Sequence, residues 1–69
     1  MTSPNLIARL VRVIAHAVVV FGDEEKAAHW LSVPLSALED RAPAELLSSQ
    51  EGIDLVERIL IRIELKIPL

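Results

Sequence analysis

Apolar side chains in the first third of the chain repeat with the period of an α-helix. Ser3 and Pro4 form a helix-start signature, because the hydroxyl can accept a free backbone N–H and proline at the first helical position has none to lose. Apolar residues then recur every three or four positions, at Leu6, Leu10, Val13, Ala17 and Val20. Because Gly22 is suited to end a helix, the pattern predicts a long first helix from Pro4 to just before Gly22.

A second helix is expected to follow directly. Asp23 can cap its start, and Glu24 and Glu25 stand in its first turn, where the positive end of the helix dipole favours acidic side chains. The helix should run to about Leu31. Trp30 on its apolar side is expected to fill core volume, although a place in a partner-facing hot spot stays open.

Two prolines divide the middle of the chain. Pro34 ends the second helix and can start a short helical turn through Leu38. Pro43 opens another short helix over residues 44–47. The charged residues between them are interpreted as a solvated corner.

The last stretch, from Gln50 to about Lys66 with Ser49 as its cap, fits two patterns. From Ile59 to Ile67 apolar and polar residues alternate, as in a half-buried strand. The helical pattern also fits, because polar residues line up at spacings of four, at Asp54, Arg58, Arg62 and Lys66. A lone strand would leave its backbone N–H and C=O groups unpaired, so helix is preferred; strand pairing across a dimer stays open.

Together these elements predict an all-α protein. We expect a small, compact bundle of about four helices, two longer ones at the ends and two short ones in the middle. Residues 1–69 should form a single helical domain, because a chain of 69 residues is too short for more. The first and last helices should supply most of the core.

Composition favours association with another polypeptide. Hydrophobic residues make up 52% of the chain, more than a small domain can hide within itself. We therefore expect a protein partner, a second copy in a homo-oligomer, or both. The longest apolar run, Ala17 to Phe21, is far shorter than the roughly 20 residues of a membrane span, so no membrane is expected. The chain has no cysteine, and a cytoplasmic location is the default expectation.

Charge argues against direct nucleic-acid binding. The net charge is −3 and there is no block of basic residues, whereas binding to phosphates needs a positive footprint. The segment from Lys26 to Leu38 has the spacing of small and apolar residues that is typical of a helix-turn-helix. However, the segment Pro34 to Asp40, which would have to read bases, contains none of the Arg, Lys, Asn or Gln side chains that do so.

The sequence predicts no catalytic, metal or cofactor-binding residue, so the chain is not expected to be an enzyme. His16 and His29 each lack a second metal ligand at helical spacing on the same face. His29 follows Glu25 by four residues, which suits a surface ion pair better than a catalytic base. Glu57 and Glu64, two turns apart, are interpreted as part of a solvated face.

Several short groups of residues occur in an order specific to one family. They are Phe21-Gly22-Asp23, Lys26-Ala27, Trp30-Leu31, Pro34, Leu38, Pro43-Ala44-Glu45-Leu46-Leu47, Gly52, Val56, Leu60 and Arg62-Ile63. In this order they resemble the toxin-binding domain of Xre/MbcA/ParS-type antitoxins, over most of the chain from Ala17 to Ile67. Two positions depart from the family pattern, because Asp40 and Lys66 stand where the family commonly has glycine. Aspartate tolerates a left-handed backbone better than most residues.

The resemblance implies a helical domain that binds a RES-domain toxin, an enzyme that consumes NAD or uses it for ADP-ribosylation. It also implies inhibition by occlusion, with the C-terminal part of the domain at the toxin's active-site cleft. The candidate partner-binding residues at this apolar and partly basic end are Arg58, Arg62, Leu65, Lys66, Ile67 and Leu69.

Relatives in this family usually carry an N-terminal helix-turn-helix domain. No such domain is expected in this sequence, so repression of an operon is not carried over to it. The alternative function is a self-associating helical bundle with a structural or scaffolding role, in which Val18 to Val20 and Ile59 to Leu65 are buried against another copy.

Overall fold

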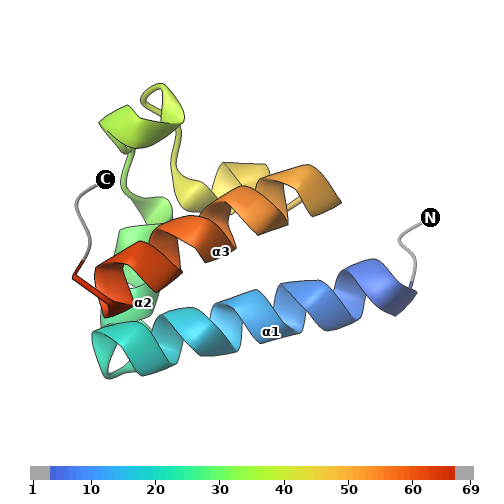
Figure 1. The fold of residues 1–69 in the computed structure, drawn as a ribbon, viewed down its shortest axis with the longest axis horizontal. Helices are drawn as coiled ribbons and strands as arrows, with labels where there is room; N and C mark the ends of the chain where they lie inside the picture. Colours follow the sequence, from blue (N-terminus) through green and yellow to red (C-terminus); the bar gives the residue numbers. More distant parts are fainter. Residues whose placement is uncertain (1–3, 67–69) are drawn as a thin grey trace.

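The computed structural model describes residues 4–66. Over these residues the fold consists of three α-helices and two single turns of 3-10 helix (Figure 1). The elements in order are α1 (Pro4–Phe21), α2 (Glu24–Ser32), η1 (Ser36–Leu38), η2 (Pro43–Leu46) and α3 (Gln50–Glu64). The all-α prediction is confirmed. So is the choice of a helix over a strand for the last element, as far as Glu64.

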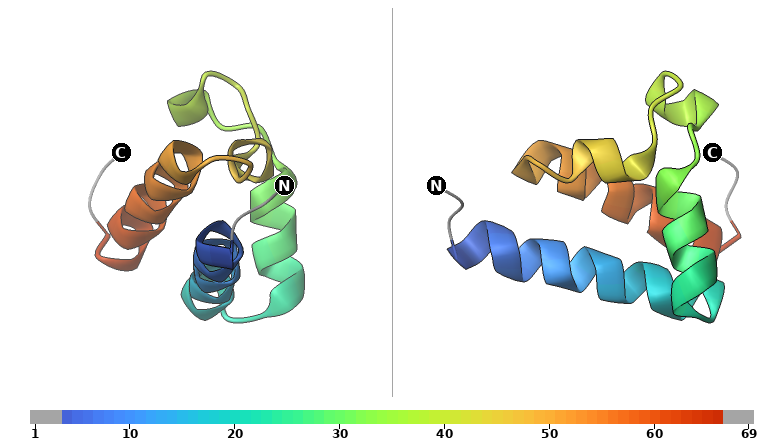
Figure 2. Two further views of the ribbon diagram at one scale, coloured as in Figure 1. Left: turned by 90° about the vertical axis from the view of Figure 1, so that its right-hand side faces the viewer. Right: turned by 180° about the vertical axis from the view of Figure 1, so that it is seen from behind.

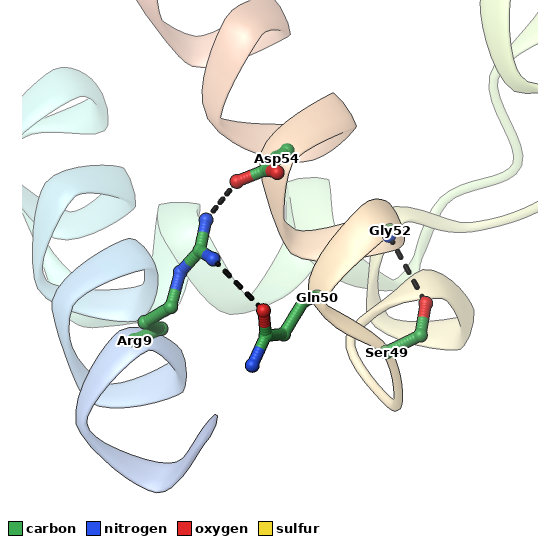
Figure 3. Close-up of polar contacts among 5 residues, drawn as sticks. All are labelled: Arg9, Ser49, Gln50, Gly52 and Asp54. Carbon is green, nitrogen blue, oxygen red and sulfur yellow. Dashed lines mark hydrogen bonds and ion pairs between the residues drawn. The ribbon is translucent and has the colours of Figure 1, made fainter. Parts of the chain in front are cut away.

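The helix ends follow the predicted capping chemistry. Gly22 adopts φ 93°, a left-handed conformation that suits glycine, and its N–H donates to the Val18 carbonyl at 2.8 Å. The Asp23 carboxylate accepts from the backbone N–H of Lys26 at 2.7 Å and so caps α2. The Ser49 hydroxyl accepts from the N–H of Gly52 at 3.0 Å and caps α3 in the same way (Figure 3).

The chain reverses between η1 and η2 through two non-glycine residues in the left-handed region. Glu39 has φ 56° and Asp40 φ 63°, and the Asp40 N–H donates to the Leu35 carbonyl at 2.9 Å. Asp40 thus adopts the left-handed conformation that aspartate tolerates better than most residues, as expected for this position. η2 begins at Pro43, and its ends lie within one residue of the short helix expected over residues 44–47. The Glu45 carboxylate accepts a hydrogen bond from the Ala42 N–H at 2.7 Å.

The core lies between α1, α2 and α3, which surround it when the molecule is viewed nearly along α1 (Figure 2, left). α1 and α3 lie side by side and run in the same direction (Figure 1). The central buried side chains are Val13 and Ala17 of α1, Ala27 of α2, and Ile53, Val56 and Leu60 of α3. The first and last helices therefore supply most of the core, as predicted.

Trp30 closes one side of this core rather than standing at its centre. Trp30 is half-buried and packs against the core cluster. The centroid of its ring lies 5.2 Å from that of the Phe21 ring, and the two ring planes are tilted by 35°. This geometry is typical of a favourable aromatic pair. The interpretation of Trp30 as a packing residue agrees with this position.

Gly52 allows α3 to begin directly against the backbone of η2. A Cβ at this position would lie 1.8 Å from the carbonyl oxygen of Leu46 and 2.7 Å from its carbonyl carbon. Both atoms belong to the main chain, which cannot move aside as a flexible side chain can. The start of α3 is therefore fixed against η2 by the absence of a side chain.

We expect Gly52→Ala to destabilise the protein by about 1–3 kcal/mol, because the added methyl group forces α3 and η2 apart. Urea unfolding measures the loss. Glu51→Ala, one residue earlier on the exposed side, is the control and should change stability by about 1 kcal/mol or less. If Gly52→Ala instead raises stability by about 1 kcal/mol, as helix propensity alone predicts, the close approach is wrong.

Candidate partner-binding surface

The side of α3 that faces away from the core carries arginines and exposed leucines. Leu55, Arg58, Arg62 and Leu65 follow one another at spacings of three or four, which places them on one side of the helix. Leu55 is 40% exposed and Leu65 62%, and both arginines are also exposed. We call these four residues, together with Lys66, the α3 outer face.

Lys66 follows α3 in a left-handed conformation. Its φ is 58°, and its N–H donates to the Ile63 carbonyl at 3.1 Å. Glycine commonly ends a helix in this conformation, and here lysine adopts it. Its exposed side chain adds a third cation to the arginines of the α3 outer face.

The structure brings four of the six predicted contact residues onto this one face. They are Arg58, Arg62, Leu65 and Lys66, all of them exposed. The other two, Ile67 and Leu69, lie outside the described residues.

Two open hollows flank Leu55 where η1 meets α3. One has a volume of about 240 Å³, and the other, of about 270 Å³, opens beside Arg58 and Arg62. Ala37 and Leu55 line both hollows, and Arg41 stands on the rim away from the α3 arginines. Each hollow is smaller than a typical small-molecule pocket. An apolar centre with an arginine rim is instead typical of a protein-binding surface.

Sequence reasoning missed Leu55, Ala37 and Arg41. For Leu55 the signal was available, because it precedes Arg58 by three residues and so shares its helix side. Ala37 and Arg41 lie beside Leu55 because the chain reverses direction at Glu39 and Asp40. No local pattern in the sequence indicates that η1 meets α3.

A second polar region joins α1 to α3. Arg9 on α1 forms an ion pair with Asp54, and its Nη1 also donates to Oε1 of Gln50 at 3.4 Å (Figure 3). Further along α1, the two ring nitrogens of His16 meet Glu57 and Glu64, the second at 3.2 Å. These pairs fix how α3 lies along α1.

The prediction for Glu57 and Glu64 missed this contact. They share a side of α3, but they flank His16 rather than forming only a solvated face. His29 and Glu25, the pair that helical spacing allowed, form no ion pair in the part of the chain that the structure describes. A hollow of about 390 Å³ beside His16 is lined by Arg9, Arg12, Ile53 and Glu57.

Opposing effects act on the pKa of His16. Partial burial lowers it, but the hydrogen bonds and negative charges of Glu57 and Glu64 raise it by more, so the pKa lies above its ordinary value. His16 thus holds its proton more firmly in the fold than in the unfolded chain. Its two nitrogens are engaged in this packing contact. Across residues 4–66 no group of three His, Cys, Asp or Glu side chains is placed to hold a metal ion.

Comparison with known proteins identifies the same kind of domain. A family model described as the antitoxin Xre/MbcA/ParS C-terminal toxin-binding domain matches residues 16–65. An antitoxin Xre of Photorhabdus laumondii is 42% identical over 59 residues, which is 84% of this chain and 40% of the relative. An antitoxin Xre of Yersinia enterocolitica is 43% identical over 58 residues, 77% of this chain and 39% of the relative.

A third relative, an antitoxin Xre of Pseudomonas putida, is 36% identical over 55 residues, or 80% of this chain and 35% of the relative. The chain thus spans only about two fifths of the length of these curated relatives. No solved structure matches it. The matched region contains α2, α3 and the last turns of α1, and therefore all of the α3 outer face except Lys66.

Raising the pH should destabilise the fold through His16. A histidine whose pKa is higher in the folded state stabilises fully below its unfolded pKa of about 6.5, and this contribution is lost as the pH rises through the folded pKa. Urea unfolding between about pH 5.5 and 8.5 should therefore show stability falling with pH, and His16→Gln should flatten the fall. His29→Gln, a change at an exposed histidine, should leave the slope intact. An unchanged slope in His16→Gln would refute this assignment.

Proposed function

This chain belongs to the family of antitoxin Xre/MbcA/ParS C-terminal toxin-binding domains, and we propose that it binds a RES-type toxin and neutralises it by covering the active site. The family description and the antitoxin relatives support the antitoxin role. The RES class of partner is the expectation that the family resemblance of the sequence carries. Because a toxin that consumes NAD would act in the cytoplasm, we expect the chain to work there.

The α3 outer face is the surface we assign to this role. It joins exposed Leu55 and Leu65 with the cations of Arg58, Arg62 and Lys66. Burying the leucines against a partner would be favourable, and arginines at the rim can form two-pronged hydrogen bonds with carboxylates of the toxin. A partner surface with acidic groups around an apolar patch would match it.

Occlusion requires no reactive group in this chain. Inhibition would follow from the bulk of α3 and its flanking hollows over the toxin's cleft, with affinity as the quantity that matters. The two nitrogens of His16 already meet Glu57 and Glu64, which is consistent with a packing role. We therefore propose a binding module and not a catalyst.

Charge reversal on the α3 outer face should separate binding from folding. The binding partner for the test is the product of the neighbouring gene, which the proposal expects to be a RES-type toxin. We expect Arg58→Glu with Arg62→Glu to weaken this complex at least about hundredfold, because attraction becomes repulsion. Calorimetric titration measures the affinity, and growth and cellular NAD on co-expression report neutralisation. Thermal melting should show a folded protein.

Arg12→Glu is the matched control for this experiment, because Arg12 is an exposed arginine of α1. It should leave toxin binding within about threefold. Equal losses of affinity in the control and in the double variant would overturn the assignment of the surface. Absence of binding by the unchanged chain would overturn the proposed function.

The last three residues offer a separate test. Deleting residues 67–69 should weaken toxin binding by about tenfold or more, because two of the predicted contact residues, Ile67 and Leu69, are lost. The melting temperature should move little, since the core cluster lies within residues 13–60. A deletion that lowers the melting temperature sharply and leaves affinity intact would contradict the prediction.

A further inference from the structure

Most of the positive charge of the molecule lies where η1 meets α3. Arg41 lines one of the two hollows on this side, and Arg58 and Arg62 line the other. Together with Lys66 they are four of the seven Lys and Arg residues of the chain. Among the described residues that line the hollows, Glu39 is the one acidic side chain, whereas the whole chain has ten. A cationic surface thus stands on a protein whose net charge is −3.

Arg41 ends a tight turn whose shape does not suit the residues that form it. The Arg41 N–H donates to the Leu38 carbonyl at 3.1 Å, and the two residues between them, Glu39 and Asp40, have φ 56° and 63°. Two positive φ angles at the centre of a hydrogen-bonded turn are typical of type I′, which favours Asn-Gly or Asp-Gly. Glutamate followed by aspartate makes the same turn with more steric strain. The chain therefore accepts strain at the corner that carries Arg41.

The turn fixes the backbone of Arg41, and the fold makes no use of its side chain. Besides the bond to Leu38, the Arg41 carbonyl accepts a hydrogen bond from the Leu35 N–H at 3.1 Å. Leu38 is only 4% exposed and anchors η1 beside α3. The Arg41 guanidinium is exposed and forms no hydrogen bond or ion pair within residues 4–66. A side chain held on a fixed backbone loses less entropy when a partner binds it.

We propose that Arg41 is a second anchor for the toxin and selects a partner with two separate acidic groups. One carboxylate of the partner meets Arg41 and another meets Arg58, while an apolar side chain between them covers Leu55 and Ala37, which line both hollows. This inference rests on the proposed function and adds the order of groups that the toxin must present, which is acidic, apolar, acidic. Since arginine can hold a carboxylate by two parallel hydrogen bonds, two such pairs fix how the toxin lies on the surface.

A nucleic acid is the rival occupant of this cationic surface, because phosphates also bind arginine. However, the wall that the two hollows share is formed by Leu55 and Ala37, which are both exposed. Phosphates would leave these apolar side chains uncovered, whereas an apolar centre with a polar rim is typical of protein interfaces. Glu39 would also repel a backbone that carries a charge at every phosphate. The observations thus favour an acidic and apolar protein surface.

Glu39 provides a test of the sign of the partner's charge. Its carboxylate lines the same hollow as Arg41 and forms no ion pair within residues 4–66. A carboxylate of the toxin that approaches Arg41 is therefore repelled by Glu39. We expect Glu39→Gln to strengthen toxin binding by about two- to fivefold. Weaker binding in this variant would indicate a basic group of the toxin at this hollow and overturn the proposed order of groups.

Calorimetric titration against the product of the neighbouring gene tests the second anchor. Arg41→Gln should weaken the complex about tenfold, and Arg41→Lys should weaken it less, because lysine keeps the charge but not the two-pronged geometry. Arg12→Gln is the matched control, since Arg12 is an exposed arginine that lines neither hollow beside Leu55. It should change the affinity by about twofold or less. Equal affinities of Arg41→Gln and Arg12→Gln would overturn the proposal.

Two further measurements separate a contact with the toxin from a change in the fold. Added salt should weaken binding of the unchanged chain more steeply than binding of Arg41→Gln, because the variant has one charge pair fewer to screen. Equal salt dependence would count against the contact. Glu39→Asn with Asp40→Gly supplies the residues that a type I′ turn prefers and keeps Arg41 in place, so it should raise the melting temperature and bind the toxin at least as tightly. Weaker binding by this variant would overturn the proposal.

Failure of this inference can be distinguished from failure of the proposed function. Absence of binding by the unchanged chain overturns the proposed function, and the inference with it. A complex that depends on Arg58 and Arg62 but not on Arg41 overturns the inference alone. Binding of random duplex DNA at low salt, lost in Arg41→Gln, would replace the acidic protein surface by a nucleic acid.

Discussion

The register of α3 along α1 is the constraint on which the rest of the molecule depends. Val13 and Ala17 meet Ile53, Val56 and Leu60 in the core, and Arg9 and His16 meet acidic groups of α3 beside it. The apolar contacts supply the driving force, whereas the charged pairs favour one position of the helix over its neighbours. Rotating α3 by one residue would turn it by about 100° and carry Arg58 and Arg62 out of their outward position. The position of the α3 outer face is thus a consequence of this packing.

Gly52 and the η1–η2 segment also help to fix the position of α3, at its N-terminal end. Contact between the start of α3 and the Leu46 backbone fixes where the helix begins. The chain reverses direction at the left-handed residues Glu39 and Asp40. Ala37 of η1 then lines a hollow together with Leu55 and Arg58 of α3. As a result, Arg41 joins Arg58 and Arg62 around Leu55, although 14 positions separate Arg41 from Leu55 along the sequence. A short chain builds this surface from two segments without adding a helix.

Local chemistry made most of the fold predictable. The boundaries of the elements depend on interactions within a few residues. They are marked by the caps Asp23 and Ser49, by Gly22, and by the prolines at 34 and 43. The helical period in the last third of the chain prevailed over the strand pattern because the structure offers no partner strand among residues 4–66. The prediction for Glu57 and Glu64 missed their partner because His16 lies 41 and 48 residues away from them. Pairings between distant helices depend on their packing, which no local pattern encodes.

The α3 outer face and the contact between α1 and α3 lie on different sides of the same helix. Ile53, Val56 and Leu60 face the core, whereas Leu55, Arg58, Arg62 and Leu65 lie on the opposite side of α3. A molecule bound at the α3 outer face would therefore leave the α1–α3 packing in place, and any energetic coupling between the two must pass through α3 itself. Since His16 sits in that packing between two carboxylates of α3, its protonation is the charge change best placed to affect this surface.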